Sequence, residues 1–534
     1  MPDPILDVAI VGAGVSGVYS GWRLRSAHPP RSVTVFEASD RVGGRLLSVE
    51  PPGIENMVAE LGGMRILPAV QPRIANLLKV LNRGRGNRIE TYPFPVDEPA
   101  NIAYLRGVHL RLQDFTTHPD RVPYRLNFLE RGHTAGQIIL NAIEQIVPGI
   151  TAPGLTEYQR RRMARDCRFG GKPLYQQGFW QVLMRVISGE AYMLGMDAGG
   201  YQSTLSNWNA ADAIPWYLSD FGVEPKYEGF KRGFQQVPLT LAERFRKAGG
   251  TLELNRHMTG FEVSADSGTV ALHFTEGGSV QARHLVLAVP RRSLDLLRPG
   301  SVFLQQREVR TLVESVTPRP LFKLFTTYEY PWWLPAGVEA GRTVTDLPVR
   351  QTYYWPTDQG QPAKSGPAML MASYDDGLNI GFWDGFRPKR GIGWRENAER
   401  PLNLEYFKGR SETSGKEGEE LDWHRYRAPR AMVAELQRQL ALIHGLSFTP
   451  EVQEAAFHDW GDDPFGGGWN SWNIGVKSWD VIKRIVQPQP GVPVYVCGEA
   501  YSDAQGWVEG ALQTADLMLR KFRVEPLLEE GLGD

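Results

Sequence analysis

The chain has 534 residues, of which 42% are hydrophobic and 22% charged, and its formal net charge is -1. This composition argues against a disordered chain, and the length favours two domains over one simple core. The balance of charges indicates neither a nucleic-acid partner nor an anionic membrane surface. Only two cysteines occur, Cys167 and Cys497, which form neither a disulfide framework nor the spacing of a metal site.

Targeting and membrane signals are missing from the printed sequence. No basic segment followed by an apolar one precedes the first strand-like residues, so we expect no signal peptide. No apolar run reaches the roughly 18 residues of a membrane-spanning helix. The ten histidines show no metal-like pairing, and we expect no metal. We therefore expect a soluble protein, cytoplasmic or otherwise, without nucleic-acid or membrane partners.

The chain begins with a predicted strand–turn–helix–strand unit. Residues 6–11 predict a short buried strand, and a glycine-rich turn covers 12–17. A helix is predicted from Val15 to about residue 27, where two prolines follow. Residues 32–36 predict a second strand, which ends at Glu37.

The middle of the chain is less regular. Residues 85–130 predict loops and short strands, and the polar segment 386–422 predicts a surface insertion. Helices are predicted over 134–147, 158–167 and around 238–248, and strands from 251 and over 285–289.

The chain closes with a predicted strand over 494–497 and a helix from about 508 to 522. Nucleotide-binding elements thus recur in three separated segments. We predict one discontinuous domain from 1–68, 232–315 and 450–534, and a second domain from 69–231 and 316–449.

The glycine-rich turn has the pattern G-x-G-x-x-G between a strand and a helix. Gly12 allows a tight turn, Gly14 lets a pyrophosphate approach the backbone, and Gly17 lets helix and strand pack closely. The N–H groups at the helix start, from Val15 and Ser16, can bind phosphate. Glu37 lies 20 residues after Gly17 and can accept hydrogen bonds from both ribose hydroxyls. The alternative is a glycine-rich turn with a solvated glutamate.

A second motif, Arg41-Val42-Gly43-Gly44-Arg45, follows four residues after Glu37. A nicotinamide enzyme has no need of it, whereas a flavin enzyme can place the arginines near the pyrophosphate and the glycines beside the flavin. The alternative is an ordinary basic loop.

With these motifs in this order, the sequence resembles the flavin amine-oxidase superfamily and is most similar to FAD-dependent L-amino acid oxidases. The resemblance continues in Glu60-Leu61-Gly62-Gly63-Met64-Arg65, in Gly498-Glu499 and in the segment 506–511. It implies an α/β fold with a Rossmann-like FAD-binding domain and an intertwined substrate-binding domain of antiparallel sheet and helices. It implies non-covalent FAD, because no cysteine follows Glu499 as it does in relatives that tether the flavin.

The resemblance also assigns residues to the cofactor. The expected FAD contacts are Gly12, Gly14, Val15, Ser16, Gly17, Glu37, Ala38, Arg41, Gly43, Gly44, Arg45, Gly62, Gly63, Met64, Arg65, Met258, Gly498, Glu499, Gly506, Trp507 and Val508.

Two basic residues are candidates for the chemistry. By resemblance, Arg65 binds the substrate carboxylate, which a planar guanidinium matches with two hydrogen bonds; the alternative is a pair with a structural acid. Lys323 lies in the apolar run Leu-Phe-Lys-Leu-Phe, and by resemblance it holds a water against flavin N5. The alternative is a lysine whose chain snorkels from an edge strand.

Aromatic residues complete the expected pocket. By resemblance, Trp507 forms a wall, Gly506 offers its carbonyl to the amine, and Trp460 is a second wall candidate. For Trp469 and Trp472 the core is the favoured place. Tyr374 is expected to help hold the carboxylate, with Ser373 as the alternative register. The stretch Asp346-Leu347-Pro348 followed by Tyr353-Tyr354 also resembles these oxidases.

The implied reaction is oxidative deamination of an L-amino acid by oxygen to a 2-oxo acid, ammonia and hydrogen peroxide. The alternatives are an amide-forming amino-acid 2-monooxygenase and a primary-amine or polyamine oxidase, which has no use for Arg65. A non-catalytic FAD-binding partner or chaperone would have no use for Lys323 and Trp507. Acidic residues of the second domain favour basic side chains and the tryptophans favour aromatic ones, so the side-chain preference stays open. The oligomeric state stays open too, with a homodimer as one option.

Overall fold

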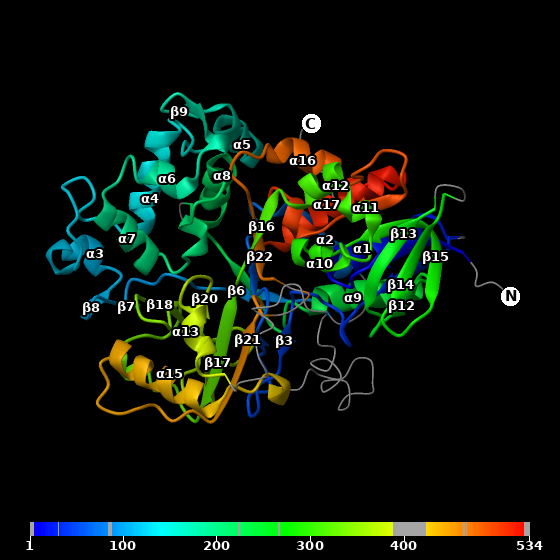
Figure 1. The fold of residues 1–534 in the computed structure, drawn as a ribbon. Helices are drawn as coiled ribbons and strands as arrows, with labels where there is room; N and C mark the ends of the chain where they lie inside the picture. Colours follow the sequence, from blue (N-terminus) through cyan, green and yellow to red (C-terminus); the bar gives the residue numbers. More distant parts are fainter. Residues whose placement is uncertain are drawn as a thin grey trace.

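The computed structural model describes residues 5–29, 31–83, 88–222, 225–264, 268–387, 423–462, 465 and 467–527. Two lobes lie side by side, each built around a large sheet, and the chain crosses between them repeatedly (Figure 1). No helix in the described part of the chain combines the length and apolar character needed to cross a membrane.

The first sheet collects strands from the beginning, the middle and the end of the chain. Its parallel part runs β12 (Thr251–Glu253), β2 (Val33–Phe36), β1 (Leu6–Val11), β15 (Ser279–Leu287) and β23 (Val494–Val496). The antiparallel strands β14 (Val270–Phe274) and β13 (Met258–Val263) extend it from β15. Parallel sheets are buried on both faces, which explains why β1 and β2 consist mainly of apolar residues.

Three helices cover this sheet. Helix α1 (Val15–Ala27) packs against both α9 (Gln236–Lys247) and α17 (Val508–Lys521). The predicted bounds of the first strand and first helix agree with the structure, and β2 begins one residue later than expected. Strands from all three expected segments of the first domain therefore meet in one sheet.

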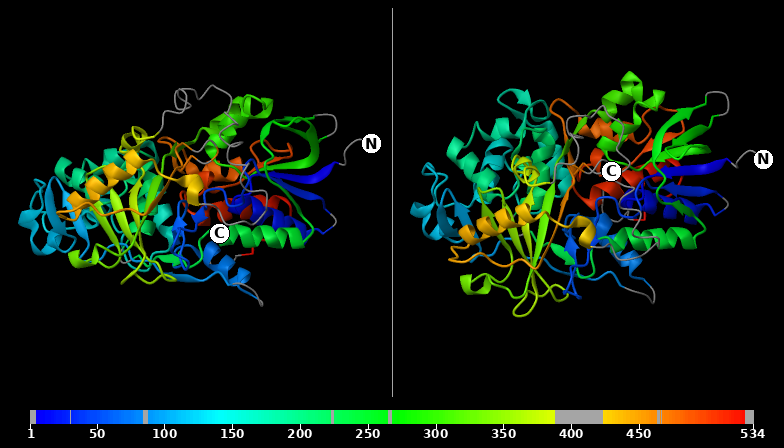
Figure 2. Two further views of the ribbon diagram at one scale, coloured as in Figure 1. Left: turned by 90° about the horizontal axis from the view of Figure 1, so that it is seen from below. Right: turned by 60° about the horizontal axis from the view of Figure 1, so that its bottom comes forward.

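The second sheet forms the base of the other lobe. Its order is β21 (Glu454–Asp459), β17 (Phe322–Tyr328), β20 (Ala368–Asp375), β19 (Gln351–Trp355), β18 (Arg342–Thr345), β7 (Ile102–Leu105) and β8 (Val108–Arg111). All pairs are antiparallel except β18 with β7. Helix α15 (Arg430–Ile443) lies across one face (Figures 1 and 2).

Strand β21 corrects the expected domain boundary. It falls inside the segment 450–534, yet it pairs with β17 in the second sheet. Because strand pairing joins residues far apart in the chain, the local pattern of β21 could not reveal its sheet. The boundary at 450 is therefore too early, and the rest of the domain division stays a prediction.

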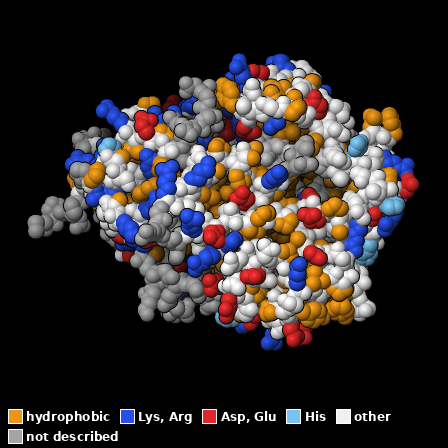
Figure 3. Space-filling model, turned by 180° about the vertical axis from the view of Figure 1, so that it is seen from behind, with side chains coloured by type: hydrophobic (Ala, Val, Ile, Leu, Met, Phe, Trp, Pro, Cys, Tyr) orange, Lys and Arg blue, Asp and Glu red, His pale blue; other side chains and the backbone are white. Residues whose placement is uncertain are grey.

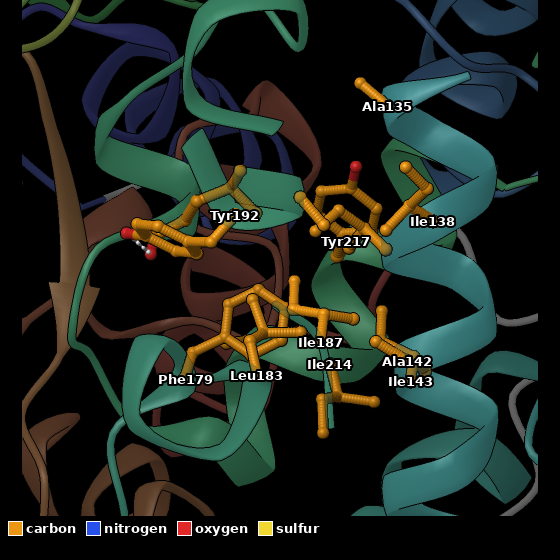
Figure 4. Close-up of a cluster of buried hydrophobic side chains, with 14 of the residues drawn as sticks. Ala135, Ile138, Ala142, Ile143, Phe179, Leu183, Ile187, Tyr192, Ile214 and Tyr217 are labelled. Carbon is orange, nitrogen blue, oxygen red and sulfur yellow. Dashed lines mark hydrogen bonds between the residues drawn. The ribbon is translucent and has the colours of Figure 1, made fainter. Parts of the chain in front are cut away.

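A helical layer covers the second lobe. It contains α4 (Ala135–Ile146), α5 (Glu157–Asp166), α6 (Phe179–Leu183), α7 (Gly189–Ala198) and α8 (Ala210–Phe221). Figure 4 shows one face of α4, with Ile138 and Ile143, pointing toward Phe179, Leu183 and Ile214. Helices α4 and α5 each begin with a threonine cap. The threonine side chain accepts a hydrogen bond from the backbone N–H of a glutamine three residues later, and the glutamine side chain accepts one from the threonine backbone N–H.

Two short sheets connect the lobes. The first is β5 (Arg65–Ile66), β11 (Glu228–Phe230) and β6 (Thr91–Pro93), and the second is β16 (Val316–Arg319) with β22 (Trp469–Trp472). The remaining helices and strands are β3 (Ser48–Val49), β4 (Ala59–Glu60), α2 (Pro72–Leu81), α3 (Asp114–Thr117), β9 (Arg168–Phe169), β10 (Lys172–Pro173), α10 (Arg291–Leu297), α11 (Val302–Gln305), α12 (Arg307–Val313), α13 (Ile380–Asp384) and α16 (Ser478–Ile485).

The surface agrees with the near-zero net charge. On the face opposite to that of Figure 1, basic and acidic side chains are both spread between apolar ones (Figure 3). The expected polar insertion, 386–422, lies outside the described residues except for 386 and 387.

Candidate functional site

A cavity of about 1000 Å³ runs from the first sheet to the second lobe. Ligand pockets span roughly 300–1,000 Å³, so this cavity has room for a dinucleotide and more. Nearly every residue expected to contact FAD lines it, from the glycine-rich turn, the 37–46 loop, the 62–65 loop and the segment 498–508. The exception among them is Gly17, which packs inside the turn, where an added Cβ would lie 1.8 Å from the carbonyl oxygen of Gly12.

The glycines at the first sheet leave a groove of bare backbone. Gly12 has φ +104°, and a Cβ there would lie 2.5 Å from the carbonyl oxygen of Ala288. The two glycine loops touch, because Gly43 N–H donates to the Ala13 carbonyl over 3.0 Å. Side chains at these positions would fill the space that a pyrophosphate needs.

Glu37 closes the turn and still faces the cavity. Its Oε2 accepts from Ala13 N over 2.7 Å, and its Oε1 accepts from Ser39 N and Ser39 Oγ over 2.9 and 2.7 Å. A carboxylate has about four acceptor positions, so one remains for a ligand hydroxyl. Ser39 was not predicted, because a serine after a strand carries no motif.

The two arginines of the second motif brace the loops of the cavity. Arg41 donates to the carbonyls of Leu46 and Gly44 over 3.1 and 2.6 Å. Arg45 donates to the Gly468 carbonyl over 2.8 Å and to Glu499 Oε2 over 2.6 Å. Both side chains line the cavity and keep further N–H groups for an anion.

Glu499 joins three separate segments. Its carboxylate accepts from Arg45 Nη1, from the backbone and side-chain nitrogens of Asn470 over 3.1 and 3.0 Å, and from Gly506 N over 2.6 Å. These four donors fill its acceptor positions. Glu499 therefore fixes Gly506 and Trp507 against β22. Asn470 was not predicted, since this contact depends on tertiary structure.

Arg65 lies on β5 at the second-lobe end of the cavity and is 5% exposed. Its guanidinium reaches the hydroxyls of Tyr353 and Tyr201 only at 3.3 Å each, and lies 4.0 Å above the Tyr227 ring. In the chain as described, no ion pair joins Arg65 to a carboxylate. Burial lowers its pKa, but these tyrosines and Asp220 raise it more, and the pKa ends well above its ordinary value. Arg65 is thus a buried, charged guanidinium whose direct hydrogen-bond partners are hydroxyls, with the Asp220 carboxylate nearby but not paired with it.

Lys323 is the second residue of β17, which lies between β21 and β20, and it is 1% exposed. This position excludes the edge-strand alternative. Its Nζ donates to the carbonyls of Glu60 and Gly62 over 3.0 and 2.6 Å and lies 4.9 Å from the centroid of the Tyr374 ring. Burial lowers the Lys323 pKa and raises that of the neighbouring Glu60. Lys323 thus holds the loop that lines the cavity; its action through a water stays a prediction.

The aromatic wall differs in part from the expectation. Trp507 and Trp460 line the cavity as predicted, and Trp460 Nε1 donates to the Leu61 carbonyl over 2.8 Å. Trp469, expected in the core, lines the cavity as well, because it stacks on Trp216 with ring centroids 5.5 Å apart. Trp472 is buried away from the cavity, as expected.

Of the two candidates Tyr374 and Ser373, it is Tyr374 that faces the cavity, because neighbouring residues on a strand point to opposite faces. Its ring faces the cavity and meets Tyr201 edge-on with centroids 5.3 Å apart. The Ser373 hydroxyl points away and donates to the Val349 carbonyl over 3.0 Å. Several lining residues were not predicted, because they lie in helices and loops without a motif: Tyr201, Thr204, Trp216, Asp220 and Asp376.

Neither cysteine lines the cavity, and Cys497 is buried behind it. Across the described ranges, no group of three or more His, Cys, Asp or Glu side chains is placed to hold a metal ion. The residues therefore fit a dinucleotide bound without a cysteine tether.

Comparisons with known proteins agree with this geometry. The sequence model described as flavin containing amine oxidoreductase matches residues 15–386 and 418–517. Aplysianin-A of Aplysia kurodai is 27% identical, over 97% of this chain and 90% of its own. An L-amino-acid oxidase of Siganus canaliculatus is 22% identical, over 99% and 87%. A solved structure of putrescine oxidase bound to putrescine is similar in fold, with TM-score 0.66, 17% identity and coverage of 97% and 99%.

The fold is therefore the two-lobed α/β fold of amine oxidases, and the cofactor is FAD. Non-covalent binding is consistent with the cavity, in which backbone N–H groups, Glu37 and the two arginines are placed to hold it.

Proposed function

Because the chain belongs to the flavin containing amine oxidoreductases, we propose that it is an oxidase of L-amino acids that uses oxygen as the electron acceptor. An L-amino acid, oxygen and water would give a 2-oxo acid, ammonia and hydrogen peroxide. When bound, FAD accepts the hydride equivalent from the substrate Cα and passes the two electrons to oxygen.

The observation that carries this proposal is the buried guanidinium of Arg65. A buried charge is costly unless it is paired, and here the hydrogen-bond partners are two phenols at 3.3 Å. A carboxylate would accept two charge-assisted bonds from the same fork. A simple amine carries no such group, so the site favours an amino acid over an amine.

The other residues at this end can orient the substrate and exclude water. Tyr374 and Tyr201 lie beside Arg65 and can donate to the same carboxylate. Gly506 lines the cavity beside Trp507 and Trp469, and in this proposal its carbonyl accepts a hydrogen bond from the substrate amine. A dry aromatic pocket favours the neutral form of the substrate amine, and only this form can release a hydride equivalent from Cα.

The test is a substrate panel with the purified holoenzyme. Peroxide release is measured with the twenty L-amino acids and with the amines that correspond to them by decarboxylation, and the products are identified by mass. We expect 2-oxo acids from amino acids and little turnover of amines. An amide product would indicate a monooxygenase, faster turnover of amines would indicate an amine oxidase, and a flavin that no substrate bleaches without air would indicate a binding protein.

A further inference from the structure

The substrate end of the cavity contains a second charged group, opposite in sign to Arg65. Asp376 follows the end of β20, lines the cavity and is 2% exposed. Residues two apart on a strand share a face, about 7 Å apart. Asp376 therefore points to the same side as Tyr374, while Asp375 between them points away from the cavity.

Residues 201–203 form hydrogen bonds with both Arg65 and Asp376. The Tyr201 hydroxyl accepts from Arg65 over 3.3 Å, and the next two residues bind Asp376. Its Oδ1 accepts from Gln202 N over 2.8 Å, and its Oδ2 accepts from Ser203 N over 3.2 Å and from the Ser203 hydroxyl. The cavity therefore presents a positive and a negative group on either side of residues 201–203.

Hydrogen bonds hold the Asp376 carboxylate firmly, and the guanidinium groups of Arg350 and Arg319 act on it only at longer range. Three of its about four acceptor positions are filled, and within the described ranges no Lys or Arg forms an ion pair with it. Asp220 is another lining carboxylate, and it lies near Arg65. It accepts from the Tyr227 hydroxyl over 2.9 Å, and Tyr227 lies under Arg65. Arg65 is thus a nearby counter-charge for Asp220.

Two tryptophans lie near Asp376, connected to it through Ser203. Ser203 Oγ accepts from Trp469 Nε1 over 3.1 Å, and Trp469 stacks on Trp216. Both indoles line the cavity. Indole faces attract cations, most strongly where water is excluded, so the carboxylate and the two rings favour the same kind of group.

We propose that Asp376 determines substrate specificity by binding a positively charged group at the end of the substrate side chain. The preferred substrates are then L-amino acids with basic side chains, such as L-lysine and L-arginine. Their carboxylate binds Arg65 and their distal cation binds Asp376 beside Trp469. This inference rests on the proposed amino-acid oxidase function and adds the class of side chain.

The experiment compares substrates that differ in the distal charge. With the purified holoenzyme, kcat/KM is measured for L-lysine and for L-norleucine, in which the distal ammonium is replaced by hydrogen. We expect the wild type to prefer L-lysine at least tenfold. Losing one partner of a buried charge pair typically costs at least about 2 kcal/mol, or about thirtyfold. Asp376→Asn should therefore lower kcat/KM for L-lysine and L-arginine by about thirtyfold or more, and change L-norleucine less than threefold.

Asp375→Asn is the matched control. Asp375 is the adjacent acid, is fully buried and does not line the cavity. This variant should keep the L-lysine preference, and so should Asp376→Glu, which keeps the charge. If Asp376→Asn lowers kcat/KM equally for L-lysine and L-norleucine, the proposal is overturned. Such a result would indicate that Asp376 has a structural role or contacts the α-amine. If Asp376→Asn fails to retain FAD, the test rests on the wild type alone. In that case, equal kcat/KM for L-norleucine and L-lysine overturns the proposal.

The failure of the proposed function gives a different result. If the enzyme oxidises cadaverine and pentylamine but neither amino acid, the amino-acid oxidase assignment fails. A preference for cadaverine would then still support a cation at Asp376. If neutral and basic amino acids are oxidised with equal kcat/KM, the proposed function holds and the proposed role of Asp376 is wrong.

Discussion

Arg65 carries a buried positive charge whose neighbours are aromatic rings and phenols. Lys323 is a second buried basic residue in the same cavity, but it differs in its partners. Its Nζ donates to two backbone carbonyls of the 60–62 loop, whereas the Arg65 fork reaches only hydroxyls at 3.3 Å. Because Lys323 is satisfied by the protein and Arg65 is not, Arg65 is the better candidate to bind a substrate anion.

Arg65→Ala should therefore lower kcat/KM for L-amino acids. Removing one partner of a buried ion pair costs about 3–5 kcal/mol, which is roughly a hundred- to several-thousand-fold in rate. Turnover of the decarboxylated amines should change far less, and FAD should stay bound. Arg65→Lys keeps the charge but not the planar fork, so it should recover only part of the loss. Steady-state kinetics on paired substrates measure this; loss of FAD or unchanged amino-acid turnover contradicts the assignment.

Lys323→Met removes the buried amino group and keeps an apolar chain of similar length. If Lys323 holds a water for the reaction with oxygen, reoxidation should slow at least about tenfold more than reduction by substrate, a difference of roughly 1.4 kcal/mol. Stopped-flow absorbance separates the two half-reactions. Lys247→Met, on the exposed face of α9, is the control. Equal effects on both half-reactions would leave Lys323 with the structural role that its bonds to Glu60 and Gly62 already show.

At the scale of elements, the predictable parts are those with a strong local pattern. Strand β1 and helix α1 agree with prediction because an apolar run, three glycines and two prolines fix their bounds. The lining residues Thr204 and Asp220 could not be predicted, because they lie on an ordinary helical pattern and face the cavity only through packing of the second lobe. For the same reason, the expected domain boundary at 450 separates β21 from its partner β17, which is distant in the chain.

Glu499 shows how elements combine to form the site. It connects the loop of Arg45, strand β22 and the start of α17 through four accepted bonds. Glu499→Gln replaces one acceptor oxygen with a donor, so buried N–H groups lose their partner at about 1–3 kcal/mol each. We expect a lower Tm and a higher KM, because Gly506 and Trp507 lose their anchor.

Thermal melts followed by flavin fluorescence, together with steady-state kinetics, test the Glu499 prediction. Glu243→Gln, an exposed glutamate on α9, is the matched control and should change neither value. A Tm that matches the wild type would mean that Glu499 is not the anchor of this wall. A lower Tm with an unchanged KM would mean that Glu499 stabilises the fold but does not affect substrate binding.

At the scale of the whole molecule, the cavity draws its walls from both lobes and from distant parts of the chain. Residues from the segments 12–16, 37–46, 62–65 and 498–511 line it. A ligand in this position contacts segments that otherwise meet only in the folded state, so FAD should stabilise the entire fold and not one lobe alone.

This placement, together with the absence of a cysteine from the cavity wall, predicts tight but non-covalent FAD. Acid precipitation should release the flavin into the supernatant, where its spectrum and mass identify it as FAD. A ligand that binds only the folded state stabilises it by about 2.7 kcal/mol at a hundred times its Kd. The Tm of the apoprotein should therefore rise with added FAD, with both lobes melting in one transition. Flavin that stays with the pellet would indicate a covalent bond, and a Tm that FAD leaves unchanged would place the cofactor outside this cavity.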